Sequence, residues 1–548
     1  MNASENSGNS GNFDPLENLN NLDYPENLDL SGGSHHQPNP LLELADKTAA
    51  LAIIKSRAQQ GVEAIPVDIE VHLSMGLPGV TMVGLPEKAV KESKERVRSA
   101  IINSGFEFPA RKIIINLAPA DLPKEGGRFD LAIAIGILAA SGQIPLDSTK
   151  NIEFAGELAL DGSLRSIPSA LPFAFYTQKS KRKLILPSAN SDEAVLIENL
   201  ECFIGEHLLE VCAHLSGRAV LPKPKAQIFQ KSLLSLPDFS EVKGQMQAKR
   251  ALEIAASGHH NVLFVGPPGT GKSMLASRVT GILPPLCPDE ALEVATIASI
   301  RGRPRSPEYF YERPFRHPHH TASPISLIGG GSFPKPGELS LAHHGVLFLD
   351  ELPEFGRSVL EVMREPLETG QVSIARANAH VTFPAKVQLI AAMNPCPCGY
   401  ATSKLKACTC SSQQVEKYKN KISGPLLDRI DLHLHVPEID QETLLNKTPS
   451  ESSASIQSRV IQARKIQMDR QGKPNASLSP QDLNIHCALN SQDQAWLSSV
   501  MNKLKLSARS FHRLLKVART IADLEQDLSI TQKHLAEAIS LRERKLGA

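Results

Sequence analysis

A glycine-rich loop between an apolar strand and a helical stretch is the most specific chemical signal in the sequence. The strand is Asn261–Val265, and the letters GPPGTGKS follow it. In such a loop, backbone N–H groups wrap phosphates, the lysine reaches the β- and γ-phosphates, and the last hydroxyl ligates Mg²⁺. The alternative is a glycine-rich turn that binds nothing, but the strand before the loop and the helix after it argue against that. The predicted nucleotide-binding residues are Gly266, Pro267, Pro268, Gly269, Thr270, Gly271, Lys272 and Ser273.

Two acidic residues end a second apolar strand, Val346–Leu349. Asp350 at that position can hold Mg²⁺ through water, and Glu351 can orient and deprotonate an attacking water. An apolar run that ends in Asp-Glu is a weak motif by itself. Together with the phosphate-binding loop it predicts a site for nucleotide hydrolysis.

A polar amide ends a third apolar strand, Val387–Met393. Asn394 could bridge the attacking water and the γ-phosphate if its strand lies between the other two. The alternative is an asparagine that only caps a turn before Pro395.

Arginines in the second half of the chain are candidates for contacts with the γ-phosphate. Arg429, in LLDRID, precedes a fourth strand, and its guanidinium could reach the nucleotide of a neighbouring subunit. A salt bridge to Asp428 or Asp431 is the simpler alternative. Arg509 and Arg513 lie on a C-terminal helix and could sense phosphate within their own subunit, although helical arginines are usually solvated.

Four cysteines crowd into 15 residues as Cys396-Pro-Cys398 and Cys408-Thr-Cys410. Four thiolates form a tetrahedral set for Zn²⁺, which is redox-inert and suits a structural role. Both pairs are spaced C-x-C instead of the usual C-x2-C, and unligated cysteines or a redox switch remain alternatives. The other cysteines are scattered on apolar patterns and are expected to be small core residues: Cys202, Cys212, Cys287 and Cys487.

Two segments offer candidate contacts for nucleic acid. One interleaves arginines with aromatic residues, which can grip phosphates and stack bases, although an exposed loop with solvated charges is the simpler alternative. The other, Val372–Phe383, alternates apolar and polar residues like a hairpin and contains Arg376, Asn378 and His380. The arginines of the first segment are Arg301, Arg303, Arg305, Arg313 and Arg316.

Residue patterns divide the chain into five expected parts. A tail at 1–47, which has no Lys or Arg before Lys47, is expected to be disordered and acidic. An α/β domain at 48–218 contains expected strands at 67–73 and 112–117 and expected helices at 87–104 and 130–141. A linker at 219–237, an α/β nucleotide-binding module at 238–447 and a helical lid at 448–548 follow. The last two helices are expected at 508–522 and 531–545.

These motifs together resemble the AAA+ ATPases, which have a parallel sheet and an α-helical lid. The stretches GPPGTGKSMLASR, FRHPHHTAS, GELSLAHHGVLFLDELPEF, AAMNPCPCG and ISGPLLDRIDLH are more specifically similar to the magnesium-chelatase-like ComM family, from about Ala52 to the C-terminus. The resemblance implies a homo-hexameric ring that hydrolyses ATP with Mg²⁺ and drives DNA branch migration during natural transformation. It also implies a finger role for Arg429, a second-sensor role for Arg509 and a pore hairpin at 372–383.

The segment INLAPADLPKEGGRFDLAIAIGILAASG resembles the Lon-type protease domain around its nucleophile. Arg128 stands at the position of the catalytic serine, and the segment Ile167–Gln178 contains no lysine. Without a hydroxyl and its amine base there is no activated nucleophile. The resemblance therefore implies a non-proteolytic domain that binds or forms rings.

Composition sets the outer limits on function. The 548 residues include 59 basic and 58 acidic side chains, a net charge of +1, which excludes a highly basic packaging protein but not a local basic groove. The most apolar run, Leu131–Ala140, is far shorter than the roughly 20 residues of a bilayer span. No signal peptide is evident, and clustered thiols favour the cytoplasm. The alternatives to a DNA motor are a chelatase-type motor that remodels a protein partner and a regulatory scaffold.

Overall fold

The computed structural model describes residues 50–84, 88–225, 237–331, 334–376, 379–440, 442–443, 450–504 and 507–542. The expected tail at 1–47 lies outside the described residues, as does the part of the expected linker from 226 to 236. Among the described helices, none is long and apolar enough to cross a membrane.

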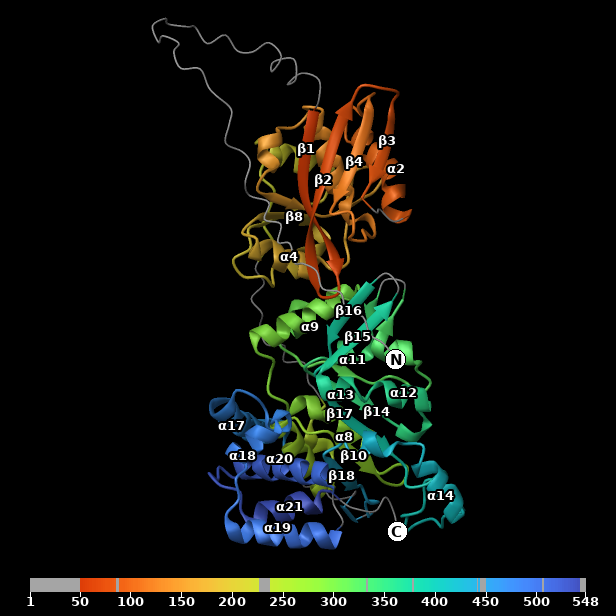
Figure 1. The fold of residues 1–548 in the computed structure, drawn as a ribbon, viewed down its shortest axis with the longest axis vertical. Helices are drawn as coiled ribbons and strands as arrows, with labels where there is room; N and C mark the ends of the chain where they lie inside the picture. Colours follow the sequence, from red (N-terminus) through yellow and green to blue (C-terminus); the bar gives the residue numbers. More distant parts are fainter. Residues whose placement is uncertain are drawn as a thin grey trace, which may run out of the picture. The chain divides into compact units, whose positions relative to one another are not determined.

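The N-terminal domain is built on a seven-stranded mixed sheet in the order β3-β4-β2-β1-β5-β8-β9 (Figure 1, red to yellow). β1 and β2 pair antiparallel along their whole length, and the strands from β5 to β9 continue the sheet in parallel. The strands are β1 (Ala50–Gln60), β2 (Glu63–Ser74), β3 (Gly79–Val83), β4 (Lys112–Ala118), β5 (Ile152–Phe154), β8 (Lys183–Pro187) and β9 (Cys202–Gly205), with a separate pair β6 (Glu157–Leu158) and β7 (Leu164–Arg165).

The helix α3 (Asp130–Ala140) forms the centre of this domain. Every one of its residues is buried. Asp130 at its start pairs with Arg96 at 2.9 Å, and the rest of its sequence is apolar on all sides and packs between the sheet and another helix. The strands expected at 67–73 and 112–117 and the helices expected at 87–104 and 130–141 are confirmed, with ends shifted by no more than four residues. The other helices are α2 (Lys88–Asn103), α4 (Ala170–Lys179), α5 (Ser191–Ala194) and α6 (Leu208–Leu215).

The second sheet has five parallel strands in the order β11-β14-β17-β10-β18, as the sequence predicted for a nucleotide-binding module. The central strands are buried on both faces, which explains their continuous apolar sequences. The strands are β10 (Val262–Val265), β11 (Phe315–Arg316), β14 (Val346–Leu349), β17 (Gln388–Met393) and β18 (Leu432–His435). Two hairpin-like pairs lie outside this sheet, β12 (Gly329–Gly330) with β13 (Lys335–Pro336) and β15 (Gln371–Arg376) with β16 (Ala379–Pro384).

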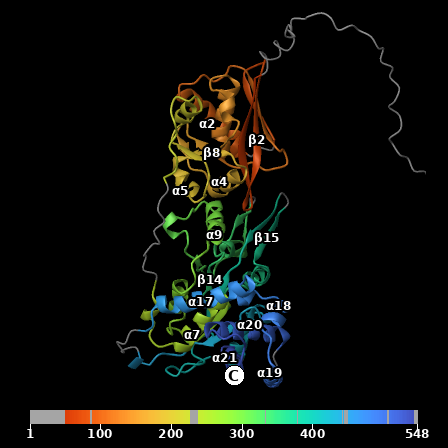
Figure 2. The ribbon, with the colours of Figure 1, turned by 90° about the vertical axis from the view of Figure 1, so that its left-hand side faces the viewer.

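Helices of the C-terminal part pack directly on the helix that precedes the phosphate-binding strand. α17, α20 and α7 pack against one another (Figure 2), and their apolar residues form one cluster with a face of the sheet. The core helices are α7 (Met246–Gly258), α8 (Lys272–Arg278), α9 (Pro288–Ile300), α10 (Pro324–Ile328), α11 (Glu338–Leu341), α12 (Arg357–Val362), α13 (Pro366–Thr369), α14 (Ser412–Lys419) and α15 (Gly424–Leu427). The C-terminal helices are α17 (Ser453–Gln471), α18 (Pro480–His486), α19 (Ser491–Leu504), α20 (Ala508–Leu524) and α21 (Gln532–Ser540).

The last helix is shorter than expected. The prediction of a helix to residue 545 is wrong, because α21 ends at Ser540. The chain then turns toward the edge of the sheet, where the N–H of His433 donates to the carbonyl of Leu541 at 2.9 Å and Arg542 forms a parallel bridge. Pairing with an open sheet edge satisfies backbone groups that a longer helix would have satisfied internally.

Packed residues run past the expected end of the N-terminal domain. Leu221 is buried in the core of that domain, and Pro222 accepts a hydrogen bond from the N–H of Ile204 at 2.9 Å. Apolar residues of α4 and α9 also share one buried cluster, and Ser299 donates to the buried carboxylate of Glu193. The domain boundaries themselves stay a prediction.

One buried ion pair in the N-terminal domain yields a stability prediction. Arg57 and Glu153 are both 2% exposed and pair bidentately at 2.6 and 2.9 Å. Replacing Arg57 with Ala should cost about 3–5 kcal/mol of unfolding free energy, because the carboxylate stays buried without its partner. Lys55→Ala removes a half-buried pair from the same strand and should cost about 1 kcal/mol or less. Thermal and denaturant unfolding of the full chain would measure both, and equal losses would contradict the prediction.

Candidate nucleotide-binding site

The glycine-rich loop leaves β10 and enters α8, as expected from the sequence. Gly269 and Gly271 have φ angles of 78° and 88°, a conformation that favours glycine. A side chain at Gly266 would place its Cβ 2.2 Å from the carbonyl oxygen of Val436, so the loop can pass this close to β18 only without one. These three glycines therefore fix the path of the loop.

Lys272 begins α8 and is 8% exposed. Its ammonium donates to the carbonyls of Gly266 and Pro267 at 2.8 Å each and lies 3.3 Å from Oδ1 of Asn394. Burial lowers the pKa of Lys272, and the charges of Asp350 and Glu351 oppose that shift. The lysine thus lies in the loop that the sequence predicted, next to the predicted amide.

The acidic pair follows β14 at the same edge of the sheet. The hydroxyl of Ser273 donates to Oδ2 of Asp350 at 2.5 Å, and Oδ1 of Asp350 accepts from the N–H of Glu351 at 2.9 Å. A hydroxyl and a carboxylate in contact are hard oxygen ligands of the kind that Mg²⁺ prefers. Ser273 and Asp350 therefore fit the metal role predicted for them.

Glu351 has a partner that the sequence analysis missed. His320 Nδ1 lies 3.2 Å from Glu351 Oε2, and Glu351 itself has a left-handed backbone with φ of 52°. The contact follows from strand register. Arg316 of β11 pairs with Leu347 of β14, and His320 and Glu351 each lie four residues further along from these partners. Sequence spacing alone does not show this, because it depends on which strand is the neighbour of β14.

Asn394 follows β17, which lies between β14 and β10 in the sheet. Met393 pairs with Val265, so Asn394 stands level with the start of the glycine-rich loop. The structure therefore brings together Asn394, Lys272, Ser273, Asp350 and Glu351.

The predicted arginines lie at the other edge of the same sheet, where the parallel strands begin. They line a pocket of about 500 Å³ whose walls include the residues just before β10, β17 and β18, whereas the glycine-rich loop follows β10. Asn261 and Gly266 bracket β10, and five residues of extended chain span about 16 Å. The basic residues of this pocket, which we call the arginine pocket, are Lys386, Arg429, Arg509, Arg513 and Lys516.

This placement corrects two expectations about the arginines. Arg509 and Arg513 do not lie beside the phosphate-binding loop of their own chain, so the prediction of phosphate sensing within one subunit is wrong for this arrangement. Arg429 does not pair with either neighbouring aspartate, because it forms an ion pair with Glu368 and donates to the carbonyl of Pro425 at 2.8 Å. Asp431 is bonded to Arg513 instead, at 2.8 Å.

Most arginines of the arginine-aromatic segment are bonded to other groups of the same chain. Arg305 donates to a backbone carbonyl of its own turn at 2.7 Å, and Arg313 donates to two backbone carbonyls at 2.6 Å each. Arg316 forms a bidentate pair with Glu338 at 2.7 and 2.9 Å. The expectation that all five arginines could grip a nucleic acid is therefore wrong. Two of them are exposed, Arg301 and Arg303.

The second nucleic-acid candidate is a hairpin, as expected. β15 and β16 pair antiparallel, and one face of the pair is buried. The buried residues of the two strands are Val372, Ile374, Val381 and Phe383. His380 is exposed. Asn378 and the side chain of Arg376 lie outside what the structure describes.

The four clustered cysteines converge on one point. Cys396, Cys398 and Cys408 have sulfur–sulfur distances of 3.4, 3.5 and 3.7 Å, and all four sulfurs lie within 4.8 Å of one another. A disulfide requires about 2.05 Å. A tetrahedral Zn²⁺ site with Zn–S bonds of about 2.3 Å separates its sulfurs by about 3.8 Å, which these distances approach. The donor set and its spacing therefore fit a closed Zn²⁺ site.

The remaining cysteines follow the expectation with one exception. Burial raises the pKa of Cys202, Cys212 and Cys487 to about 12, as expected of core thiols. Cys287 is exposed at the start of α9, so its assignment to the core is wrong.

Another group with metal-ligand residue types is bonded in a way that disfavours a metal. Glu293 accepts from His343 Nε2 and His344 Nε2 at 2.8 and 2.9 Å. His343 Nδ1 already accepts the N–H of Lys386 at 3.0 Å, so its Nε2 carries the proton. Burial lowers the pKa of His343 to about 4, which keeps it neutral near pH 7. This group is a structural hydrogen-bond network.

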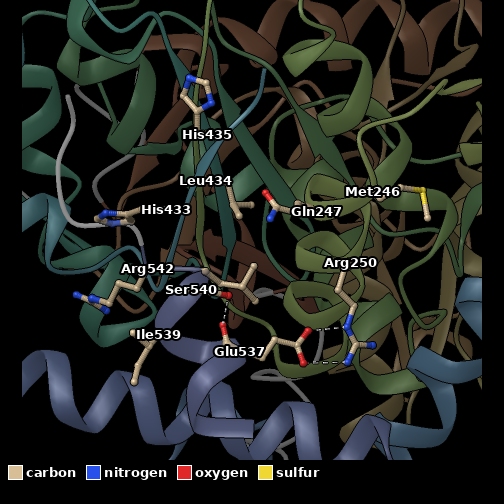
Figure 3. Close-up of a pocket in the computed structure, with 11 residues that line it drawn as sticks. Met246, Gln247, Arg250, His433, Leu434, His435, Glu537, Ile539, Ser540 and Arg542 are labelled. Carbon is tan, nitrogen blue, oxygen red and sulfur yellow. Dashed lines mark hydrogen bonds and ion pairs between the residues drawn. The ribbon is translucent and has the colours of Figure 1, made fainter. Parts of the chain in front are cut away.

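A further pocket of about 680 Å³ lies between α7, β18 and α21 (Figure 3). Its most prominent charged groups, Arg250 and Glu537, face each other across it and pair at 2.9 Å. None of the predicted site residues lines this pocket. We therefore assign the candidate site to the loop edge of the sheet and not to this pocket.

Comparison with known proteins agrees with the geometry. The family description "Magnesium chelatase, subunit ChlI" matches residues 238–444, "Subunit ChlI of Mg-chelatase" matches 69–190, and the C-terminal description of the same subunit matches 450–542. The matches cover the N-terminal domain, the nucleotide-binding module and the helical C-terminal part in turn.

Individual relatives are similar over nearly their whole length. The chain is 52% identical over 495 residues to YifB of Escherichia coli K12, and 51% identical over 499 residues to competence protein ComM of Haemophilus influenzae. In both cases the alignment covers 90% of this chain and 97% of the relative. A distant similarity, 23% over 299 residues, joins 53% of the chain to 33% of DNA replication licensing factor Mcm6 of Drosophila melanogaster. The chain therefore belongs to the ComM-like group of magnesium-chelatase-like AAA+ ATPases.

Proposed function

We propose that this chain is an ATP-hydrolysing ring motor that acts on DNA in the cytoplasm, as a branch-migration helicase that promotes integration of DNA during natural transformation. The observation that supports hydrolysis is the convergence of five predicted residues at one edge of the parallel sheet. The DNA substrate is supported by the similarity to a relative named as a competence protein and, distantly, to a DNA replication factor.

The residues at the loop edge divide the chemistry among them. The backbone N–H groups of the glycine-rich loop and the ammonium of Lys272 bind the ATP phosphates, while Ser273 and Asp350 hold Mg²⁺. Mg²⁺, when bound, neutralises charge on the β- and γ-phosphates. Glu351 accepts the proton of the attacking water, and Asn394 orients that water.

The arginine pocket completes the site of a neighbouring subunit in this proposal. Its guanidinium groups lie at the edge opposite the loop, so Arg429 as the finger and Arg509 as the second sensor reach the nucleotide of the next copy. An interface that joins one edge of a subunit to the other edge of its neighbour is head-to-tail, and such an interface forms a ring when the rotation between copies closes. A homo-hexamer is the ring that the family implies.

Two further parts of the chain have proposed roles. The four clustered cysteines hold one structural Zn²⁺ per subunit, supported by their sulfur spacing. The N-terminal domain is Lon-like in shape but non-proteolytic, because Arg128 replaces the nucleophile and is buried. It serves binding or ring formation.

A chelatase-type motor that remodels a protein partner for metal insertion is the second candidate function. It is favoured by the family descriptions, which name the magnesium chelatase subunit over three segments of the chain. The two functions differ in whether DNA stimulates ATP hydrolysis.

The first prediction separates binding from hydrolysis at the loop edge. Glu351→Gln should bind ATP with near-normal affinity but hydrolyse it about 10²-fold more slowly or worse, because the water loses its base. Lys272→Ala should weaken nucleotide binding itself. Binding of a fluorescent ATP analogue and steady-state phosphate release measure the two effects. Hydrolysis at the normal rate by Glu351→Gln would refute the assignment.

The second prediction tests whether the arginine pocket acts on a neighbour. Arg429→Ala and Lys272→Ala chains should each be inactive as pure rings. Mixed in equal amounts before assembly, they should recover about a quarter of normal ATPase activity, because half of the subunits keep the lysine and half of their neighbours keep the arginine. A mixture of Lys272→Ala with Glu351→Gln is the matched control and should recover none. Absence of recovery in the first mixture would contradict action in trans.

The third prediction concerns the substrate. Branched DNA should stimulate ATP hydrolysis, and the protein with ATP should resolve strand-exchange intermediates at low salt. Arg376→Ala should reduce the stimulation by DNA more than the basal rate of hydrolysis. It should also make the slope of log K for DNA binding against log salt concentration less steep, by about 0.9 for each phosphate contact that is lost. Lys150→Ala, a charge loss at an exposed site of the N-terminal domain, should change neither quantity. An ATPase that ignores DNA would favour the protein-remodelling function.

A further inference from the structure

The segment from Asn394 to Ser411, which we call the cysteine loop, joins the nucleotide site to α14. It starts at Asn394, one of the residues placed beside Lys272, and its first cysteine follows two residues later. Cys396 is fully buried, whereas Cys408 at the far end is exposed. The first sulfur is therefore fixed close to the hydrolysis residues, and the last ones lie toward solvent.

Gly399 brings this loop into contact with the phosphate-binding loop. Its φ is 90°, and a Cβ added there would lie 2.9 Å from Pro268 Cδ and 3.9 Å from Asn394 Cγ. The turn is held by the sulfur of Cys396, which accepts the N–H of Ala401 at 3.3 Å. One thiolate thus sets the position of a backbone turn that packs on Pro268.

A second tie links the other side of the cysteine loop to the nucleotide site. Glu438 accepts from the hydroxyl of Ser403 at 2.6 Å and from the N–H of Lys404 at 3.0 Å. The residue before it, Pro437, accepts from the Gln245 amide at 2.8 Å, and the same amide lies 3.2 Å from the carbonyl of Thr270. The cysteine loop therefore touches the phosphate-binding loop directly and through these neighbours.

The cysteine loop has no apolar core of its own. From Ala401 to Lys417 no residue is buried, and Leu405 is 83% exposed. Without apolar burial, a loop of this length has little to offset its ordering entropy. Metal ligation can supply that free energy, since the binding energy of a structural Zn²⁺ is also folding energy.

We propose that Zn²⁺ bound by Cys396, Cys398, Cys408 and Cys410 is a positioning element of the ATPase site, which holds the Gly399 turn against Pro268 and Asn394 beside Lys272. The inference rests on the proposed ATP hydrolysis. It goes further because it makes hydrolysis, and not stability alone, depend on a metal that does not touch the nucleotide.

The main test uses Cys408→Ser, because that ligand is exposed and its loss disturbs the fold least. Cys287→Ser is the matched control, an exposed cysteine outside the cluster. Wild-type chain should carry one Zn²⁺ by elemental analysis, Cys408→Ser should lose it, and Cys287→Ser should keep it. We expect Cys408→Ser to lower kcat for ATP about tenfold or more, while the Kd for a fluorescent ATP analogue changes little. All rates are measured below the Tm of each variant.

Gly399→Ala tests the coupling with the metal in place. The added Cβ must push against Pro268, so kcat should fall while the chain keeps one Zn²⁺. Loss of Zn²⁺ in Cys408→Ser with unchanged kcat would overturn the positioning role and leave a purely structural metal. Wild-type protein without Zn²⁺ would overturn the site itself. Wild-type protein with Zn²⁺ but without ATPase activity would overturn the proposed function and the positioning role, and leave the metal site standing.

Discussion

The parallel direction of the five central strands is the constraint on which the candidate site depends. Because all five run the same way, whatever follows a strand collects at one edge of the sheet and whatever precedes a strand collects at the other. The glycine-rich loop, Asp350, Glu351 and Asn394 follow their strands, and Arg429 precedes its strand. Hydrolysis groups and arginines are thereby separated onto opposite edges of one subunit. A head-to-tail neighbour is the simplest geometry that reunites them.

Much of this arrangement could be predicted from the sequence. Strands buried on both faces are continuous apolar runs, and the polar or glycine-rich residues that directly follow such runs are the candidates for binding and catalysis. That pattern located β10, β14 and β17 and the residues after them. Strand order was not visible in the pattern, and two findings depend on it. His320 reaches Glu351 only because β11 lies next to β14, and the arginine pocket forms only because β10, β17 and β18 are neighbours.

Side-chain partners explain where the predictions of nucleic-acid contacts went wrong. An arginine in a loop has the same appearance in a sequence whether it faces solvent or donates to backbone carbonyls. Arg313 satisfies the carbonyls of Pro284 and His344, and Arg316 is neutralised by Glu338. The chain as a whole is near neutral, so a DNA-binding field must come from a few local cations. Of the five arginines of the 301–316 segment, Arg301 and Arg303 are exposed and so remain candidates for such contacts.

The groups of the nucleotide site are bonded to one another in this conformation, which bears on how hydrolysis starts. Lys272 is satisfied by carbonyls of its own loop, and Glu351 is held by His320. A phosphate bound here would compete with those carbonyls for the ammonium, and the contact with His320 involves one of the two carboxylate oxygens of Glu351. His320 belongs to the segment after β11, which leads into α10 and the β12–β13 pair. Movement of that segment would release or restrain Glu351 without any change at the phosphate-binding loop. The register between β11 and β14 therefore couples the position of this segment to the contact of Glu351 with His320.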